Sequence, residues 1–93
     1  MAYELPLDDE IRKAGWKVKI RDRERLEPPH VTIFFKTNVW RLCLRTKQFL
    51  DEGGSWRQID KKVREAIEAD WKTLCQEWDK LYPGNPVPSE NDE

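Results

Sequence analysis

The sequence predicts an α+β domain in which a three-stranded antiparallel sheet packs against one long helix. Apolar and charged residues alternate with a period of two between residues 16 and 45, which is typical of half-buried strands. A helical period replaces this alternation between residues 56 and 81. Five Trp, two Tyr and three Phe among 93 residues supply a small apolar core, although Lys, Arg, Asp and Glu make up 38% of the chain. This aromatic content argues against intrinsic disorder.

A short helix is expected before the sheet, over about residues 8–14. Asp8 is a suitable N-cap, the acidic residues that follow suit the first turn of the helix dipole, and Gly15 is a suitable stop. Residues 1–7 are expected to be loosely ordered.

The three strands are expected to form a meander with short connections. The charged residues 22–27 and then Pro28-Pro29 connect the first strand to the second. Thr37-Asn38 supplies a tight turn, and so short a connection makes the last two strands an antiparallel hairpin. The strands are predicted over residues 16–21, 30–36 and 39–45.

The predicted C-terminal helix covers about residues 56–81. A capping-box pattern of Ser55 and Gln58 begins it, and no Gly or Pro interrupts its apolar stripe. A single helix of this length extends roughly 40 Å, which is long for this domain. A break near Glu68–Asp70 is therefore the alternative.

Residues 1–82 are expected to form one domain, and residues 83–93 a flexible, Pro-rich acidic tail. The chain shows neither a signal peptide nor an apolar run of the roughly 20 residues that a membrane span needs. Cys43 and Cys75 form no CxxC pair, and with a single His they exclude the usual four-ligand zinc site. We expect free thiols in a reducing cytoplasm, no metal and no cofactor.

The net charge of −1 conceals a strong asymmetry along the chain. Residues 16–47 carry nine basic and three acidic groups, whereas residues 48–93 carry six basic and eleven acidic groups. A molecule polarised in this way can hold a local positive field despite its nearly neutral total.

The basic residues gather on the sheet face that the helix is not expected to cover. That outer face is expected to show them around Phe34, together with His30, Thr32 and Cys43. Basic groups neutralise phosphates and an exposed ring can stack a base, so the favoured ligand is nucleic acid, RNA more than DNA. The alternative interpretation is a solvated face that keeps the sheet soluble. The predicted contact residues are Lys17, Lys19, Arg21, Phe34, Lys36, Arg41 and Arg45.

Two further functions stay open. The same face, or the loop of residues 53–58, could bind an acidic protein, as in a subunit of a two-gene, toxin–antitoxin-like system. In the third, a small ribonuclease-like toxin, His30 would be the acid/base catalyst and Arg21 or Arg45 would stabilise the phosphorane. A strand-end histidine bonded to a neighbour is the alternative for His30. Asp70 falls inside the apolar stripe of the helix, so it needs a partner: a sheet arginine, an indole N–H or, in a catalytic arrangement, His30.

Six residues carry a resemblance to a known family: Arg21, Pro28, Pro29, His30, Trp71 and Trp78. The order of a strand, a Pro-Pro-His strand start and a Trp-containing C-terminal helix resembles a family of small uncharacterised bacterial proteins classed as a domain of unknown function (DUF4160-like). The resemblance covers roughly residues 15–81 and implies a similar fold and a regulatory or toxin–antitoxin role. In that family a second histidine commonly lies two positions after the first. Thr32 occupies that position here, so the resemblance carries no paired-histidine site.

Overall fold

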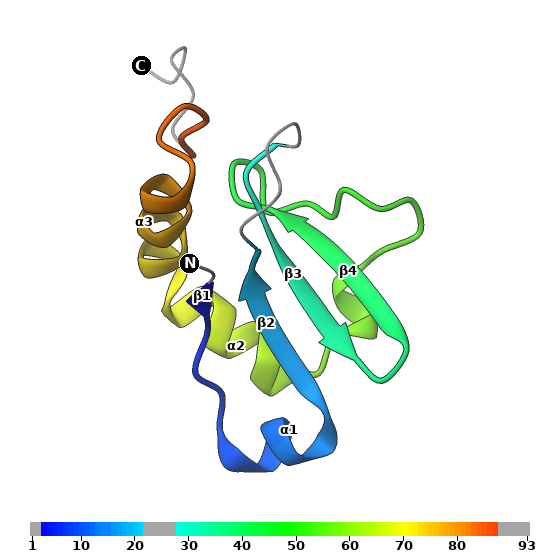
Figure 1. Ribbon diagram of the computed structural model, residues 1–93. Helices are drawn as coiled ribbons and strands as arrows, with labels where there is room; N and C mark the ends of the chain where they lie inside the picture. The colour runs from blue at the N-terminus through cyan, green and yellow to red at the C-terminus, as the bar shows by residue number, and fades with distance from the viewer. Residues whose placement is uncertain (1–2, 22–27, 88–93) are drawn as a thin grey trace.

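A computed structural model describes residues 3–21 and 28–87 of the chain. The domain is α+β, with an antiparallel sheet in the order β1-β2-β3-β4 and helices packed on it (Figure 1). The predicted connection over residues 22–27 lies outside the described residues. The elements in chain order are β1 (Tyr3–Glu4), α1 (Asp9–Ala14), β2 (Trp16–Ile20), β3 (His30–Phe35), β4 (Asn38–Cys43), the 3-10 helix η1 (Trp56–Gln58), α2 (Lys61–Ala69) and α3 (Trp71–Leu81).

The predicted alternation of β2, β3 and β4 is confirmed by their register. Val18 lies opposite Ile33, and Ile33 lies opposite Trp40, so one apolar row crosses the sheet. All three side chains are buried. The hairpin turn differs from the prediction, because Phe35 pairs with Asn38 and the turn residues are therefore 36 and 37.

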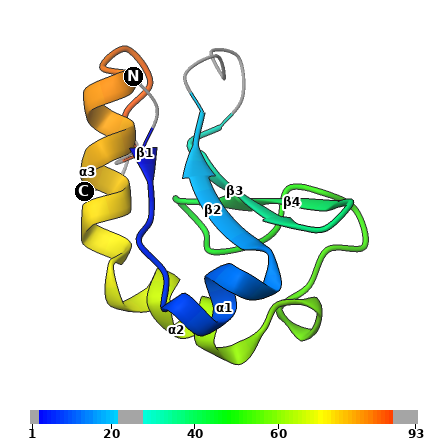
Figure 2. The ribbon, with the colours of Figure 1, turned by 60° about the horizontal axis from the view of Figure 1, so that its bottom comes forward.

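The prediction of three strands is wrong, because residues 3–4 add a fourth. Tyr3 pairs with Ile20, and the Leu5 amide donates to the Val18 carbonyl at 2.9 Å. Leu5 is buried in the core, so this part of the N-terminal segment is fixed and not loosely ordered as predicted. Figure 2 shows β1 between β2 and α3.

The predicted single C-terminal helix is also wrong, although the alternative break near residues 68–70 is confirmed. Ser55 and Gln58 form the predicted capping box, but it begins only the short η1. Asp60 then caps α2 by accepting from the Lys62 amide at 2.8 Å. Asp70 has φ −107° and ψ 23° between α2 and α3 and ends the first of these helices. The chain turns there, so the two helices meet the sheet from different directions.

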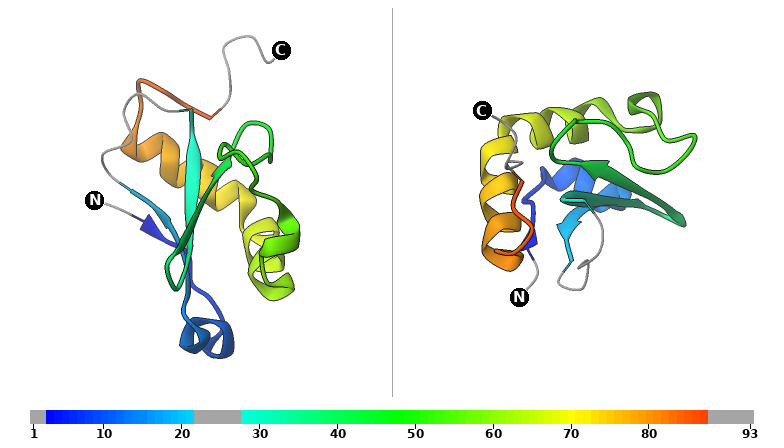
Figure 3. Two further views of the ribbon diagram at one scale, coloured as in Figure 1. Left: turned by 90° about the vertical axis from the view of Figure 1, so that its right-hand side faces the viewer. Right: turned by 90° about the horizontal axis from the view of Figure 1, so that it is seen from above.

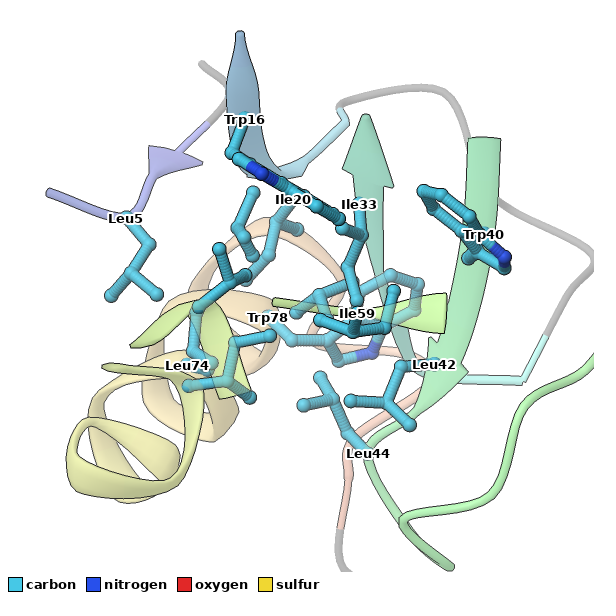
Figure 4. Close-up of a cluster of buried hydrophobic side chains, with 14 of the residues drawn as sticks. Leu5, Trp16, Ile20, Ile33, Trp40, Leu42, Leu44, Ile59, Leu74 and Trp78 are labelled. Atoms are coloured by element: carbon cyan, nitrogen blue, oxygen red, sulfur yellow. The ribbon is translucent and has the colours of Figure 1, made fainter. Parts of the chain in front are cut away.

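The core lies between the apolar sheet face and these helices (Figure 4). Leu74 and Trp78 of α3 lie in one buried cluster with Ile20, Ile33 and Ile59. Helix α2 and η1 lie on one side of β3 and β4 (Figure 3). We call the opposite side, which carries Lys17, Phe34 and Val39, the outer face.

Two segments after β4 complete the domain. Residues 48–50 run along the free edge of β4, where the Leu50 amide donates to the Arg41 carbonyl at 2.8 Å. Residues 83–87, the first part of the predicted flexible tail, lie against the domain: Val87 is buried, and the Trp78 indole N–H donates to the Asn85 carbonyl at 2.7 Å. Residues 88–93 lie outside the described residues. In the described part of the chain, no helix has the length and apolar character to cross a membrane.

Candidate functional site

The outer face is built by cross-strand pairing. Lys17 lies opposite Phe34, and Phe34 lies opposite Val39, so these three side chains form one row across β2, β3 and β4. Side chains in such direct register lie roughly 5 Å apart at Cβ. A basic group, an aromatic ring and an aliphatic group therefore follow one another across the sheet.

Four of the seven predicted contact residues come together at the hairpin end of this face. Lys17, Lys19, Phe34 and Lys36 line one open hollow of about 510 Å³, with Gly15 at its end. Within residues 3–21 and 28–87, the side chains of Lys17 and Lys19 take part in no ion pair or hydrogen bond. We call this group of four side chains the basic hollow.

Lys36 and Phe34 have particular settings within the basic hollow. Lys36 occupies the hairpin turn with a positive φ of 56°, and its ammonium lies 5.1 Å from the centre of the Phe35 ring. Phe34 is half-buried, so part of its ring stays accessible. The positive charge directly beside Phe34 is that of Lys17, its cross-strand partner. A basic group next to an aromatic ring is the combination that a phosphate-linked base requires.

Arg41, a predicted contact residue, is committed elsewhere. Its guanidinium donates to one oxygen of Asp51 at 2.8 and 3.0 Å, and its amide donates to the other oxygen at 2.8 Å. These bonds to Arg41 lower the pKa of Asp51, more than its partial burial raises it. Arg41 thus fixes the loop after β4 and does not line the basic hollow.

Arg45 is likewise occupied, by the C-terminal segment. Its guanidinium donates to the carbonyls of Val87 at 2.9 Å and Pro86 at 2.8 Å, and to the Asn85 side-chain oxygen at 3.2 Å. Arg21 follows β2 directly, and its carbonyl accepts a hydrogen bond from the Tyr82 hydroxyl. Neither residue lines the basic hollow.

His30, the weak catalytic candidate, is not accessible to a substrate. It is 1% exposed, its Nδ1 lies 2.9 Å from the Pro28 carbonyl oxygen, and its ring centre lies 5.5 Å from that of Trp78. Thr32 and Cys43 were also expected on the exposed face, yet they are 2% and 5% exposed. The outer face is therefore open at the hairpin end and closed at the other.

Asp70 forms no hydrogen bond or ion pair with His30 among the described residues. It lies half-buried at the junction of α2 and α3. Burial raises the pKa of Tyr3, and the negative charges of Asp70 and Glu77 raise it further. Both carboxylates are therefore close enough to β1 to act on the Tyr3 hydroxyl.

The sequence did not single out a second hollow, formed by β4, the loop that follows it and η1. Val39, Trp40, Asp51 and Gln58 line it with residues 52–54, and its volume is about 170 Å³. Val39 is 51% exposed, the highest value for a large apolar residue in the described chain. The signal that could have revealed it is the alternation of β4, which places Val39 on the same face as Phe34.

Cys43 and Cys75 are free thiols, as predicted. Burial raises the pKa of Cys75, so its thiolate is suppressed. In the described ranges, no group of three His, Cys, Asp or Glu side chains is arranged to hold a metal ion.

Comparison of the chain with family models, with curated proteins and with solved structures gave no match. The resemblance to the bacterial domain of unknown function stays a prediction, and function has to be argued from the geometry of the outer face.

Proposed function

We propose that this protein binds single-stranded nucleic acid, RNA in preference to DNA, at the basic hollow. The observation that carries the proposal is that three lysines and Phe34 line one hollow, and that Lys17 and Lys19 have no ionic partner in the described chain. Arg41 and Arg45, by contrast, are held by Asp51 and by the carbonyl of Val87.

The arrangement favours a single strand over a duplex. A base stacked on Phe34 must leave its neighbours and enter the hollow, which an unpaired strand allows and a duplex resists. The lysines then meet the flanking phosphates. Lys17 and Lys19 are two residues apart on one strand, so they lie on the same face about 6.6 Å from each other along β2.

The proposal places the protein in the cytoplasm, where the free thiols of Cys43 and Cys75 are stable and single-stranded RNA is present. It uses no metal and no cofactor. The ribonuclease alternative loses its support, because His30 is buried away from the basic hollow. An acidic protein remains the competing partner for the same lysines.

The test is fluorescence anisotropy of a labelled single-stranded RNA of about 12 nucleotides, with DNA of the same sequence beside it. Three phosphate contacts give a salt slope of about −2, so affinity should fall roughly 20-fold between about 50 and about 200 mM salt. Replacing Lys17 and Lys19 by Glu should abolish binding. The matched control replaces Lys61 and Lys72, exposed lysines of α2 and α3, in the same way and should keep most of the affinity.

A second variant tests the ring. Phe34→Leu keeps the apolar bulk but removes the stacking surface, so affinity should fall at least about fivefold while the salt slope is unchanged. Equal binding by wild type, the Lys17/Lys19 variant and the control would refute the proposal. Stoichiometric capture of an acidic protein that survives moderate salt, without RNA binding, would replace it with the protein-binding alternative.

A further inference from the structure

We propose that the bound strand lies with its phosphates over β2 and its bases directed across the sheet toward residues 51–54, where Glu52 selects cytosine over uracil. The preferred pyrimidine ligand is then single-stranded RNA rich in cytosine. This inference rests on the proposed function and adds the orientation and base preference of its ligand.

The first step is that one residue of each hollow belongs to the same cross-strand pair. Phe34 lines the basic hollow, Val39 lines the second hollow, and the two residues are direct cross-strand partners. From Lys17 to Val39 the row crosses two strand spacings, about 10 Å. A base that stacks on Phe34 therefore points its far edge over Val39 and toward the second hollow.

The second step is charge. The row begins at the lysines of β2, crosses an apolar pair, and ends beside the carboxylates of Asp51 and Glu52. A strand bound in the opposite sense would place its phosphates beside these carboxylates, which like charges disfavour. The electrostatic gradient thus fixes which side of the strand faces which edge.

The third step identifies the group that meets the base. Asp51 is occupied by Arg41, and the Gln58 side-chain oxygen accepts from the Ser55 amide and the Trp40 indole, both at 3.0 Å. Glu52 is exposed, and none of the hydrogen bonds or ion pairs of the described residues involves its side chain. It is the acceptor in this hollow that remains available to a ligand.

The loop also leaves room for a base. A side chain placed at Gly53 would meet no atom within 4 Å, so the space beside Glu52 is open. Gly53 has φ 86°, a conformation that glycine adopts without the steric cost of a Cβ.

The chemistry of an ionised carboxylate sets the preference. It only accepts hydrogen bonds, so it pairs with the N4 amino group of cytosine. Uracil presents the O4 carbonyl oxygen at the corresponding position, which the carboxylate repels. Cytosine against uracil is the decisive comparison, because the two rings have the same size and differ at this edge.

The experiment measures anisotropy with labelled oligocytidylate and oligouridylate of equal length at low salt. Wild type should bind the cytidine strand at least about fivefold more tightly. Glu52→Gln should bring the affinity ratio close to one, because an amide both donates and accepts. Glu65→Gln, the same change at an exposed glutamate of α2, is the control and should keep the wild-type ratio.

The outcomes separate this inference from the proposed function. Equal and salt-sensitive binding of both strands by wild type overturns the inference and leaves the proposed function standing. A cytidine preference that persists in Glu52→Gln overturns the assignment of Glu52. Failure of both strands to bind wild type refutes the proposed function itself, and with it this inference.

Discussion

A substitution at Arg45 tests whether this arginine stabilises the fold or binds nucleic acid. The sequence places it among the contact residues, whereas its guanidinium bridges two backbone carbonyls and one side-chain oxygen of residues 85–87. Arg45→Lys keeps the positive charge and removes the planar fork that reaches several acceptors at once. The substitution should therefore destabilise the fold and leave RNA affinity unchanged.

The magnitude follows from the three bonds. Hydrogen bonds from a charged donor contribute about 1.5–3 kcal/mol when buried and much less when exposed. The bond to the Val87 carbonyl is partly buried, and the other two are exposed. We count the bond to Val87 nearly in full and neglect the two exposed bonds. The free energy of unfolding should then fall by about 2 kcal/mol, which lowers Tm by about 8–16 °C for a domain of this size.

Urea unfolding at neutral pH, followed by tryptophan fluorescence, measures this loss. Trp78 reports on the same region, because its indole N–H donates to the Asn85 carbonyl. Arg57→Lys is the control, since Arg57 is an exposed arginine of η1 and no partner of its side chain is found in the described chain. An unchanged midpoint for Arg45→Lys, or a loss of RNA affinity like that of the Lys17/Lys19 variant, would refute the reasoning.

Three further predictions concern stability. Because Arg41 holds the folded-state pKa of Asp51 below its unfolded value, Asp51 contributes stability that is present above the unfolded pKa, near 3.9, and is lost as pH falls through the folded pKa. Asp51→Asn should therefore reduce the difference between urea midpoints at neutral and strongly acidic pH, and an unchanged difference would contradict this. Gly53→Ala should cost about 1–2 kcal/mol, because φ is 86° and no neighbouring atom is touched. Gly84→Ala, also without a neighbour but without a positive φ, should be neutral or slightly stabilising, and equal losses at both sites would contradict the backbone explanation. Trp78→Phe should cost about 2–4 kcal/mol in denaturant unfolding, because it leaves a cavity and removes a buried indole hydrogen bond; a loss under about 1 kcal/mol would contradict this.

The strands β2, β3 and β4 were predictable because each buries one face, and the resulting alternation is contained within a few residues. β1 was not, because Tyr3–Glu4 is too short to show any period. Its position depends on pairing with Ile20, which lies far along the chain.

The apolar stripe of the C-terminal half predicted which residues are buried but not that the helix breaks. Val63, Ile67, Leu74 and Trp78 are all fully buried, so the stripe continues through the break. The break carries no Gly or Pro, so no residue type that usually ends a helix marks it. Asp70, with φ −107° and ψ 23°, is the residue at which the chain leaves the helical conformation.

The basic hollow was partly predictable for the same reason. Lys17, Lys19 and Phe34 alternate with core residues, so their face follows from local sequence. The hydrogen bonds of Arg41 to Asp51 and of Arg45 to the Val87 carbonyl were not predictable. Their acceptors lie in loops that meet the sheet only in the folded chain.

The Asp51 side chain also affects whether two molecules of this protein can associate through their strand edges. An unpaired amide on an outer strand invites a second molecule to add its own strand, which is how many β-proteins begin to aggregate. The carboxylate of Asp51 occupies that position on β4 by accepting from the Arg41 amide, directly beyond the point where residues 48–50 run along the strand. The Asp51 carboxylate that binds the Arg41 side chain therefore also protects this strand edge from pairing with a second molecule. A variant of Asp51 that still folds should form fibrils more readily than the wild type.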